Sequence, residues 1–497
     1  MKKLYFLLVS LLLMNFLNAQ WTQIGNDIDG EAAGDRSGFS VSLSSDGNTL
    51  AIGAPYNCGD SGCAGHVRIY ENNAGVWTQI GNDIDGETGN DRLGYSVSLS
   101  SDGSIVAIGG PDNSYGIGPR TGHVRIYKNN AGVWTQIGSD IDGEAPGDQS
   151  GCSVSLSSDG NTVAIGAHRN YGNGQDAGHV RIYKNIAGVW TQIGSDIDGE
   201  AIFNYSGCSV SLSADGNTLA IGAYTNDGNG SGSGHVRIYK NNAGVWTQIG
   251  NDIDGEAAGD NSGYSVSLSS DGSIVAIGAY RNDGNGNNAG HVRIYKNISG
   301  VWTQLGSDID GEAAEDNSSY FGLSLSADGN TLAIGARYND GNDTTDTKRG
   351  HVRVYRINAG VWTQLGSDID GEAADDHSGR GVSLSSDGSV VAIGAWNNDG
   401  NDTTDTKRGH VRVYSIPTVG INEKSFNLEV FVYPNPTTGK ITIKAECVES
   451  VEVINPQGKQ IYTGKESEVD LSNQPKGIYI IKVITEKQTV TRKFIKQ

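Results

Sequence analysis

One unit of about 56 residues recurs seven times along this chain. Its first landmark is W-T-Q-(I/L)-G, which begins at Trp21, Trp77, Trp134, Trp190, Trp246, Trp302 and Trp362. Its second landmark is G-H-V-R, which contains His66, His123, His179, His235, His291, His351 and His410. A period of this length indicates one supersecondary unit stacked many times. A residue that recurs in seven equivalent places is more often structural than catalytic.

The composition favours many short strands. The chain of 497 residues has 72 glycines and only 9 prolines, and it lacks clear amphipathic helical periodicity. Charge is divided unevenly: residues 21–420 hold 23 Lys+Arg against 48 Asp+Glu, whereas the last 77 residues hold 11 against 9. A body this acidic repels phosphates and anionic lipid surfaces, so nucleic acid and membrane partners are disfavoured.

The N-terminal residues have the pattern of an export signal. Lys2 and Lys3 precede an apolar run over residues 4–13, and a small residue, Ala19, comes before Gln20. We therefore predict a signal peptide over residues 1–19 that is cleaved between Ala19 and Gln20. The apolar run is short for a membrane span, although an uncleaved anchor is the alternative.

The five cysteines are an odd number for an exported protein. Cys58 and Cys63 lie in one loop, where they would form a disulfide in an oxidising compartment or remain two free thiols. Cys152 and Cys208 take the place that Phe39, Tyr95 and Tyr264 hold in other copies, and they are predicted to be buried apolar side chains. Cys447 is predicted to be an unpaired thiol.

Each unit contains four segments with strand character, which in the first complete copy are residues 39–44, 49–54, 66–70 and 76–80. Short Asp/Asn/Gly turns between them are typical of antiparallel hairpins. The first segment alternates bulky residues with serine, which would let consecutive sheets nest closely. Four-stranded sheets repeated seven times predict an all-β fold, a seven-bladed β-propeller, with an open solenoid as the alternative.

The two ends of the array predict how it closes. Residues 21–25 form a fourth strand with no sheet before it, and residues 410–415 form a third strand that lacks a following W-T-Q. We expect these segments to pair and so close a propeller over residues 20–415. The long connections from fourth to first strands hold 29 of the 48 acidic residues, so one face of the disc is expected to be negative and to bind a ligand.

The repeat resembles a known family. The stretch S-G-F-S-V-S-L-S-S-D-G-N-T-L-A-I-G-A-P over residues 37–55, followed by G-H-V-R-I-Y, is similar to the FG-GAP repeat of integrin-α-type propellers. The resemblance covers all seven units, and the sixth copy restores the Phe-Gly pair at Phe321 and Gly322. In that family an acidic loop between strands one and two binds calcium. Here residues 44–49 carry too few carboxylates, so that metal site is not carried over.

The C-terminal part resembles a second family. V-Y-P-N-P-T-T-G at residues 432–439, V-I-N-P-Q-G-K at 453–459 and G-I-Y-I-I-K-V at 477–483 are similar to the C-terminal sorting domain of the Bacteroidetes type IX secretion system. The resemblance covers residues 427–497, after a linker over residues 416–426. It implies a small β-sandwich recognised by the type IX secretion machinery, and hence a protein that is secreted or held at the outer cell surface.

The repeated polar residues offer candidate sites. The seven histidines are expected to bond a neighbouring loop rather than share a metal, because equivalent positions are spread around a ring. The arginines of G-H-V-R are expected to hold the acidic connections, and the tryptophans to cover the sheet edges or, alternatively, to stack on sugars. Asp27, Asp29 and Glu31 would bind calcium or magnesium, or accept backbone N–H bonds. The loops at residues 226–230, 282–286 and 339–346 have the same two interpretations.

A catalytic site would need residues that depart from the repeat. Such departures are residues 115–120, His168, residues 202–205, the insertions at 343–349 and 402–408, His377, Arg380 and Trp396. They contain no recognisable set of nucleophile, base and orienting group, and loop drift between duplicated units also explains them. We therefore predict no catalytic residue, no metal ligand and no cofactor, with calcium left open.

The resulting hypothesis is a secreted or surface-displayed, non-enzymatic binding or adhesion propeller. A glycan-binding or polysaccharide-active surface protein is the first alternative, because propellers host both activities. A structural surface-layer protein is the second. The expected partners are the secretion machinery and a surface protein or glycan of unknown identity.

Overall fold

The computed structural model describes residues 20–58, 62–114, 118–341, 347–400, 406–416, 431–444, 448–455, 459–485 and 489–497. The predicted signal peptide and most of the predicted linker lie outside these residues. The chain divides into two compact units, Met1–Thr418 and Val419–Gln497, which are described separately. The described residues contain no helix that is long and apolar enough to cross a membrane.

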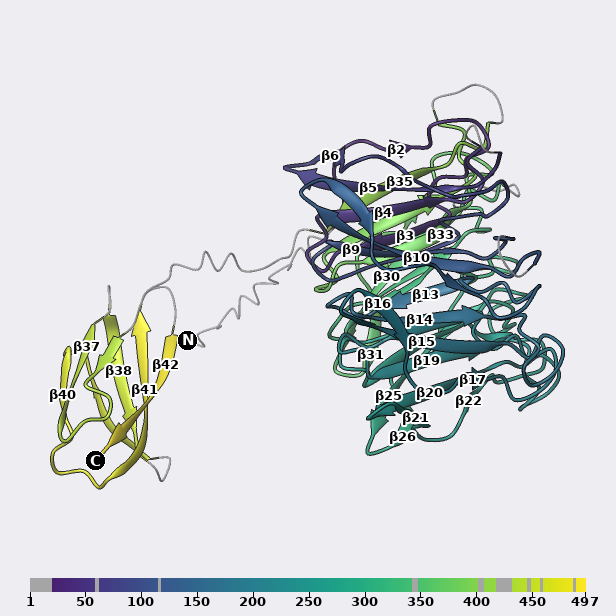
Figure 1. Cartoon of the computed structure of the whole chain (residues 1–497). Coiled ribbons are helices and arrows are strands. Elements are labelled where there is room, and N and C mark those ends of the chain that lie inside the picture. The colour runs from purple at the N-terminus through teal and green to yellow at the C-terminus, as the bar shows by residue number, and fades with distance from the viewer. Residues whose placement is uncertain are drawn as a thin grey trace, which may run out of the picture. The chain divides into compact units, whose positions relative to one another are not determined.

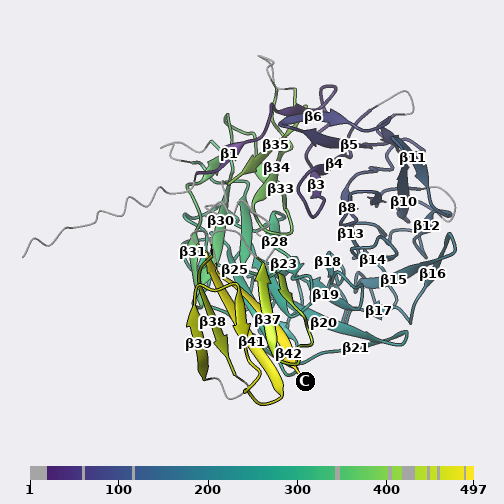
Figure 2. The ribbon, with the colours of Figure 1, turned by 90° about the vertical axis from the view of Figure 1, so that its left-hand side faces the viewer.

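The described part of the N-terminal unit forms seven antiparallel sheets of five strands each, arranged around a central axis (Figures 1 and 2). The strands nearest the axis are β3 (Ser40–Leu43), β8 (Ser96–Leu99), β13 (Ser153–Leu156), β18 (Ser209–Leu212), β23 (Ser262–Leu268), β28 (Leu323–Leu325) and β33 (Ser378–Leu384). The second strands are β4 (Thr49–Ala54), β9 (Ile105–Gly110), β14 (Thr162–Ala167), β19 (Thr218–Ala223), β24 (Ile274–Ala279), β29 (Thr331–Ala336) and β34 (Val390–Ala395).

The third strands carry the G-H-V-R motif: β5 (His66–Asn73), β10 (His123–Asn130), β15 (His179–Ile186), β20 (His235–Asn242), β25 (His291–Ile298), β30 (His351–Asn358) and β35 (His410–Ser415). The outermost strands carry W-T-Q: β6 (Val76–Gln79), β11 (Val133–Gln136), β16 (Val189–Gln192), β21 (Val245–Gln248), β26 (Val301–Gln304), β31 (Val361–Gln364) and β1 (Thr22–Gln23). The predicted all-β repeat of antiparallel sheets is therefore confirmed.

A fifth strand in every sheet was not predicted. It contains only the Ile-Asp pair of D-I-D-G-E: β7 (Ile84–Asp85), β12 (Ile141–Asp142), β17 (Ile197–Asp198), β22 (Ile253–Asp254), β27 (Ile309–Asp310), β32 (Ile369–Asp370) and β2 (Ile28–Asp29). Each pair lies opposite the first two residues of a third strand, as Asp85 lies opposite His66. The acidic connection therefore begins as an edge strand, which places its carboxylates beside the histidine.

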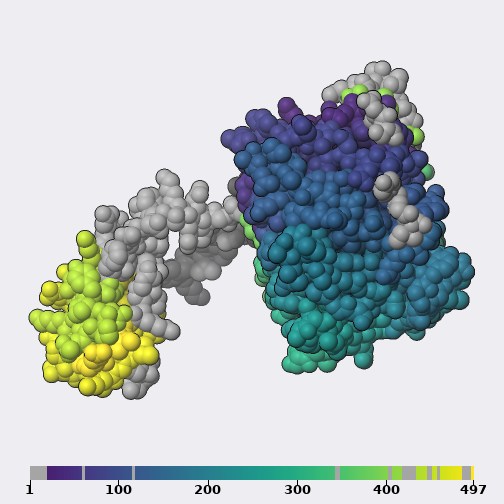
Figure 3. All heavy atoms as spheres, in the orientation of Figure 1, coloured from purple at the N-terminus to yellow at the C-terminus, as the bar shows by residue number. Residues whose placement is uncertain are grey.

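The core lies between neighbouring sheets. One cluster joins Ala51, Val67 and Ile69 of the first sheet to Val106 and Ile108 of the next. The second strands are apolar on both faces because each is covered by a sheet on either side. In the space-filling view, consecutive sheets follow one another without a break over the visible face (Figure 3).

The turn between third and fourth strands is tighter than predicted. β5 extends to Asn73, which leaves Ala74 and Gly75 as a two-residue loop with φ of 53° and 91°. Two consecutive positive φ values match the twist of a hairpin, which explains the recurring glycine at the second position.

The segment that contains Trp21 pairs with the last sheet, in the arrangement that the sequence predicts. Thr22 lies opposite Ser415 and Gln23 opposite Tyr414. The indole N–H of Trp21 donates to the carbonyl of Leu365 at 2.8 Å, and its side chain is 4% exposed. The first and last sheets also share a hydrophobic cluster.

Three series of hydrogen bonds link each sheet to the next and also link the first sheet to the last. Every tryptophan of W-T-Q donates to a carbonyl of the preceding unit, at 2.8–3.1 Å. A serine Oγ in each innermost strand accepts from a leucine N–H of a neighbouring strand, at 2.9–3.0 Å. A third series of backbone bonds links Ser45, Ser101, Ser158, Ala214, Ser270, Ala327 and Ser386. The serines of the innermost strands are therefore needed as hydrogen-bond acceptors, in addition to being small enough for consecutive sheets to approach closely.

The C-terminal unit is a separate β domain. One sheet contains β36 (Phe431–Tyr433), β37 (Lys440–Lys444) and β40 (Glu468–Asp470). The other contains β39 (Gln460–Gly464), β38 (Val448–Ile454), β41 (Gly477–Thr485) and β42 (Thr489–Lys496). Both sheets contribute to one hydrophobic core, in which Ile441 and Val469 of the first sheet join Tyr479 and Phe494 of the second.

We predict that Trp21→Ala destabilises the N-terminal unit by about 3 kcal/mol, the range for a buried tryptophan. Strand β1 has no hairpin turn to hold it against β35, so losing this anchor also releases the chain end. Urea unfolding measures the free energy, and limited proteolysis followed by mass spectrometry measures cleavage near residue 25. The control is Trp134→Ala, which removes an equivalent bond within a tethered hairpin. Equal protease resistance of the two variants would contradict the anchoring role.

Candidate ligand-binding site on the axis

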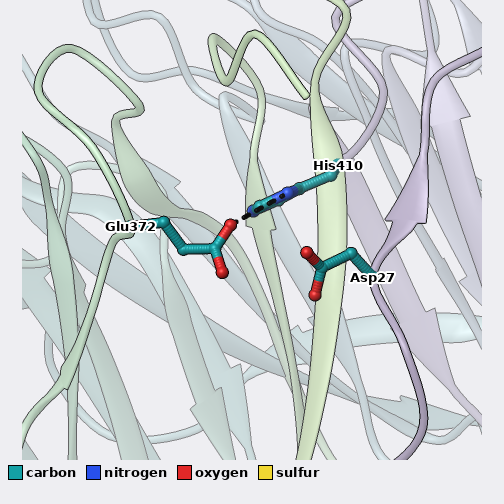
Figure 4. Close-up of side chains that lie close together, drawn as sticks. All are labelled: Asp27, Glu372 and His410. Carbon is teal, nitrogen blue, oxygen red and sulfur yellow. Dashed lines mark ion pairs between the residues drawn. The ribbon is translucent and has the colours of Figure 1, made fainter. Parts of the chain in front are cut away.

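Each G-H-V-R histidine is buried between two acidic connections. The Nδ1 atom of His66 lies 3.5 Å from Asp83 Oδ2, in its own unit, and 3.9 Å from Glu31 Oε2, in the preceding unit. His410 has the same arrangement where the two ends of the array meet, 3.8 Å from Glu372 and close to Asp27 (Figure 4). The histidines therefore bridge consecutive connections.

The arginine of each motif holds the preceding connection, as predicted. Arg68 donates from Nη2 to the carbonyl of Asp29 at 2.6 Å, and its Nη1 lies 3.9 Å from Glu31. The other six arginines bond the equivalent carbonyls: Arg125, Arg181, Arg237, Arg293, Arg353 and Arg412. The glutamine of W-T-Q also contributes, because Gln79 donates to Asp83 at 2.6 Å.

The side chains of these clusters are spaced closely enough for a metal site. Within the part of the chain that the structure describes, however, the histidines lack the second hydrogen bond that a metal-binding histidine makes. In the cluster of Asp27, Glu372 and His410, the three candidate ligand atoms lie within 4.8 Å of one another. A metal on Nδ1 would require the proton on Nε2, and His410 Nε2 is a buried atom with no hydrogen-bond partner among the described residues. Metal-binding histidines almost always donate that second N–H. The geometry fits a histidine that donates from Nδ1 to a carboxylate, which is a structural role.

The carboxylates of one connection serve two different histidines. Asp27 and Asp29 both lie near His410, the latter at 4.0 Å, whereas Glu31 lies near His66. They therefore do not gather around one point as the calcium hypothesis requires. In the loop at residues 226–230, Asn226 accepts from Gly228 N at 2.7 Å and Asp227 from Gly232 N at 2.8 Å. Turn chemistry accounts for these side chains.

A cavity of about 240 Å³ opens on the axis at the end where the N-terminal residues of the innermost strands meet. One position of the repeat contributes Phe39, Tyr95, Cys152, Cys208, Tyr264 and Arg380 to its lining. The S-V-S-L residues that follow this position are nearly invariant among the copies. The seven copies of this position have equivalent surroundings in the fold, so the fold does not require different residues there. We therefore attribute the variation in residue type to the cavity.

Two further variable positions lie around the same end of the axis, and His168 and Tyr224 among them line the cavity. One follows the second strand and holds Pro55, Pro111, His168, Tyr224, Tyr280, Arg337 and Trp396. The other precedes the innermost strand with a φ of 50–55°, and holds Arg36, Arg92, Gln149, Tyr205, Asn261, Asn317 and His377. The departures His168, Tyr205, His377, Arg380 and Trp396, scattered in the sequence, are thereby brought to one end of the axis.

Aromatic side chains at these positions contact one another around the cavity. Tyr205 stacks on Tyr224, with ring centroids 5.4 Å apart, and Tyr224 meets Tyr264 at 4.9 Å. On the other side, His377 meets Trp396 edge to face at 5.8 Å. The site combines aromatic surface with cations that originate from the sixth and seventh units.

Cys152 is buried as predicted, Cys208 is half-buried, and both line the cavity. Their thiols point to the carbonyls of Gly166 and Gly222, at 3.3 and 3.5 Å. Burial raises the pKa of Cys152 to about 11 and that of Cys208 to about 12, so both remain protonated thiols at neutral pH. Cys58 and Cys63 form a disulfide. Ala19 and Cys447 lie outside the described residues.

The remaining departures do not join the site. Arg120 is exposed, 3.9 Å from Asp112, while residues 115–117 lie outside the described part. Of the two insertions, residues 347–349 and 406–408 are described. The sequence reasoning missed Phe39, Tyr224, Tyr264 and Arg337. The available signal was variation at one repeat position while its neighbours stayed constant.

Comparison with known families supports both resemblances. Residues 253–295 match the FG-GAP repeat, and residues 431–497 match the secretion system C-terminal sorting domain. The two matches lie in the N-terminal and the C-terminal unit, respectively. No curated protein matches the sequence.

Solved structures with a similar arrangement are distant in sequence. A putative 6-phosphogluconolactonase from Bacteroides uniformis is 13% identical, with 68% of this chain and 86% of that chain covered and a TM-score of 0.48. The periplasmic gluconolactonase of Pseudomonas aeruginosa is 16% identical, with 85% and 97% covered and a TM-score of 0.46. The Dos1 propeller is 13% identical, with 76% of each chain covered and a TM-score of 0.40.

We predict that the N-terminal unit loses stability as the pH falls from 7.5 to 5.5. Burial, with a smaller effect of the neighbouring arginine, lowers the pKa of His179, His291, His351 and His410 to about 4. Below pH 6.5 the unfolded chain therefore binds protons that the folded chain does not. For one histidine the full loss is about 3 kcal/mol, and it is complete only near pH 4.

The partly exposed glutamates of the acidic connections act in the opposite direction. Burial raises the pKa of Glu144, so the folded state gains stability there as the pH falls through that raised value. The ordinary pKa of a glutamate lies below the pH range of 7.5 to 5.5. The histidines therefore determine how the free energy of unfolding changes with pH in this range. Urea unfolding at several pH values should show a shallower slope for His179→Asn than for the wild type. The control Lys184→Asn, on the exposed side of β15, should keep the wild-type slope, and equal slopes in all three would contradict the assignment.

Proposed function

We propose that residues 20–415 form one closed, seven-bladed β-propeller that acts as a non-enzymatic binding or adhesion module. In this proposal the sorting domain directs export through a type IX machinery, and the protein works outside the cell or on its surface. The match of residues 431–497 to the sorting-domain family supports the export route. A signal peptide over residues 1–19 would supply the first step.

The observation that carries the binding role is the placement of the variable residues. Three positions in each unit vary among copies, and all three surround one end of the axis. The strand motifs S-V-S-L, G-H-V-R and W-T-Q are nearly constant because they must satisfy the same sheet-to-sheet bonds seven times. Side chains freed from that constraint, and gathered at a cavity, are the ones available to contact a ligand.

The chemistry of the cavity favours binding over turnover. Its described lining contains no Asp or Glu, so it has no carboxylate pair for acid–base catalysis. Its thiols are protonated, and His168 Nδ1 has no hydrogen-bond partner among the described residues that would orient the ring as a base. These features support the proposal of binding without turnover.

A glycan is the ligand class that the aromatic lining favours. Tyrosine and tryptophan rings offer flat apolar faces with a polar edge, which suit a sugar ring. Trp396 is half-buried beside the cavity, and its buried indole N–H has no partner among the described residues. It is therefore the most direct residue with which to test glycan binding.

The test is binding of the mature full-length protein to an array of neutral and acidic glycans. We expect the wild type to bind a subset, and Trp396→Ala to reduce that signal at least about tenfold. Tyr171→Ala, an exposed tyrosine away from the cavity, should bind as the wild type does. Unchanged binding by Trp396→Ala, or glycan cleavage abolished by that substitution, would contradict the proposal.

A further inference from the structure

The axial cavity contains a buried cation that the fold does not neutralise. Arg380 on β33 is 5% exposed, and its guanidinium lies between the rings of Phe39 and Phe321, at 3.1 and 4.1 Å from their centroids. It donates one hydrogen bond, to the carbonyl of Phe39. Within the described residues, no carboxylate pairs with it. Its remaining N–H groups belong to a side chain that lines the cavity.

A second arginine adds positive charge beside it. Arg337 is 8% exposed and stacks over Tyr320 and Tyr338, at 4.1 and 4.6 Å. Its Nε is a buried atom with no hydrogen-bond partner in the described part of the chain. Burial is the main reason why the pKa of Arg380 is lowered to about 9. The positive charge of the nearby Arg337 lowers it further. Arg380 remains a cation at neutral pH.

The arginines of G-H-V-R show that this arrangement is unusual within the same molecule. Six of those seven lie 3.7–3.9 Å from the glutamate of the preceding unit, and Arg125 lies 3.3 Å from Glu87. Arg92, next to the cavity, is paired with Asp112 at 3.0 Å. A buried charge without a partner is costly, and proteins keep one chiefly where function requires it. An anion from solution would supply the missing charge.

The cavity also restricts the size and shape of that anion. Its volume of about 240 Å³ suits a molecule the size of a single sugar. The lining also includes Tyr224 and Tyr264, and the thiols of Cys152 and Cys208, which offer polarisable and apolar contacts but no charge. An anionic group at Arg380 and a ring against the uncharged residues would match both parts of the lining.

We propose that the axial cavity binds a carboxylate carried on a sugar-sized ring, as in a uronic acid, with the carboxylate held by Arg380 and favoured by the positive charge of the nearby Arg337. This inference rests on the binding role proposed above. A guanidinium suits a carboxylate because it offers parallel N–H donors in one plane. The ring packs against the tyrosines, which exclude water from the ion pair and strengthen it.

Calorimetric titration of the mature full-length protein tests the inference with defined probes. Galacturonate and glucuronate carry the proposed chemistry, galactose is the neutral ring, benzoate is a carboxylate on a flat aromatic ring, and sulfate is an anion without a ring. We expect a uronate to bind at least about tenfold more tightly than galactose, the factor for a charge-assisted hydrogen bond. Benzoate or sulfate binding as tightly as the uronates, or galactose matching them, would overturn the proposal.

Variants separate ligand binding from a structural role of the arginine. Arg380→Gln should weaken uronate binding at least about tenfold without lowering the melting temperature, because the buried charge it removes is unpaired. Arg281→Gln, an exposed arginine on the same face, should change neither quantity. If Arg380→Gln lowers the melting temperature and leaves uronate affinity intact, the arginine is structural and the inference fails.

The two proposals fail in different ways. If the array shows binding of neutral glycans that Trp396→Ala abolishes, while uronates have no advantage over galactose, the binding role stands and the charged-ligand inference is wrong. If neither the array nor any probe shows binding, the binding role itself fails.

Discussion

Hydrogen bonds that cross from one sheet to the next govern this structure. Each innermost strand must offer a serine Oγ to a neighbouring leucine N–H, and each outermost tryptophan must reach a carbonyl of the preceding unit. The sheets approach so closely near the axis that a Cβ on Gly53 would collide with the carbonyl oxygen of Gly94. These requirements are the same in every unit, so they explain why S-V-S-L, L-A-I-G-A and W-T-Q recur with little change.

The same constraint separates structural from functional residues without any comparison between organisms. The histidines and arginines of G-H-V-R are chemically versatile, yet they occur seven times and hold the connections between sheets. The cavity position, in contrast, holds phenylalanine, tyrosine, cysteine or arginine in equivalent surroundings. In a repeat protein, the units can be compared with one another. Residues that differ at a position where the fold makes the same demand in every unit are candidates for a functional role.

Most of the backbone arrangement could be predicted from the sequence. Local patterns define each hairpin, and the lone W-T-Q at Trp21 needed a partner that only the last sheet lacked. The Ile-Asp strands were missed because two residues within an acidic stretch leave no periodic signal. The site was missed for a different reason. His168, Arg380 and Trp396 were recognised as departures from the repeat. Their convergence could not be predicted, because it depends on which residue of the innermost strand faces the axis, and this follows only from how the sheets pack.

Pairing of Thr22 with Ser415 has a consequence for how the molecule reaches its final state. Contacts between residues so distant along the chain form late, because a long loop must close before they stabilise anything. Until then the final sheet lacks its outermost strand and shows an unpaired edge on which other chains can assemble. The edge of β35 therefore stays open to aggregation until β1 pairs with it, and the rate of that single pairing sets how long the exposed edge persists.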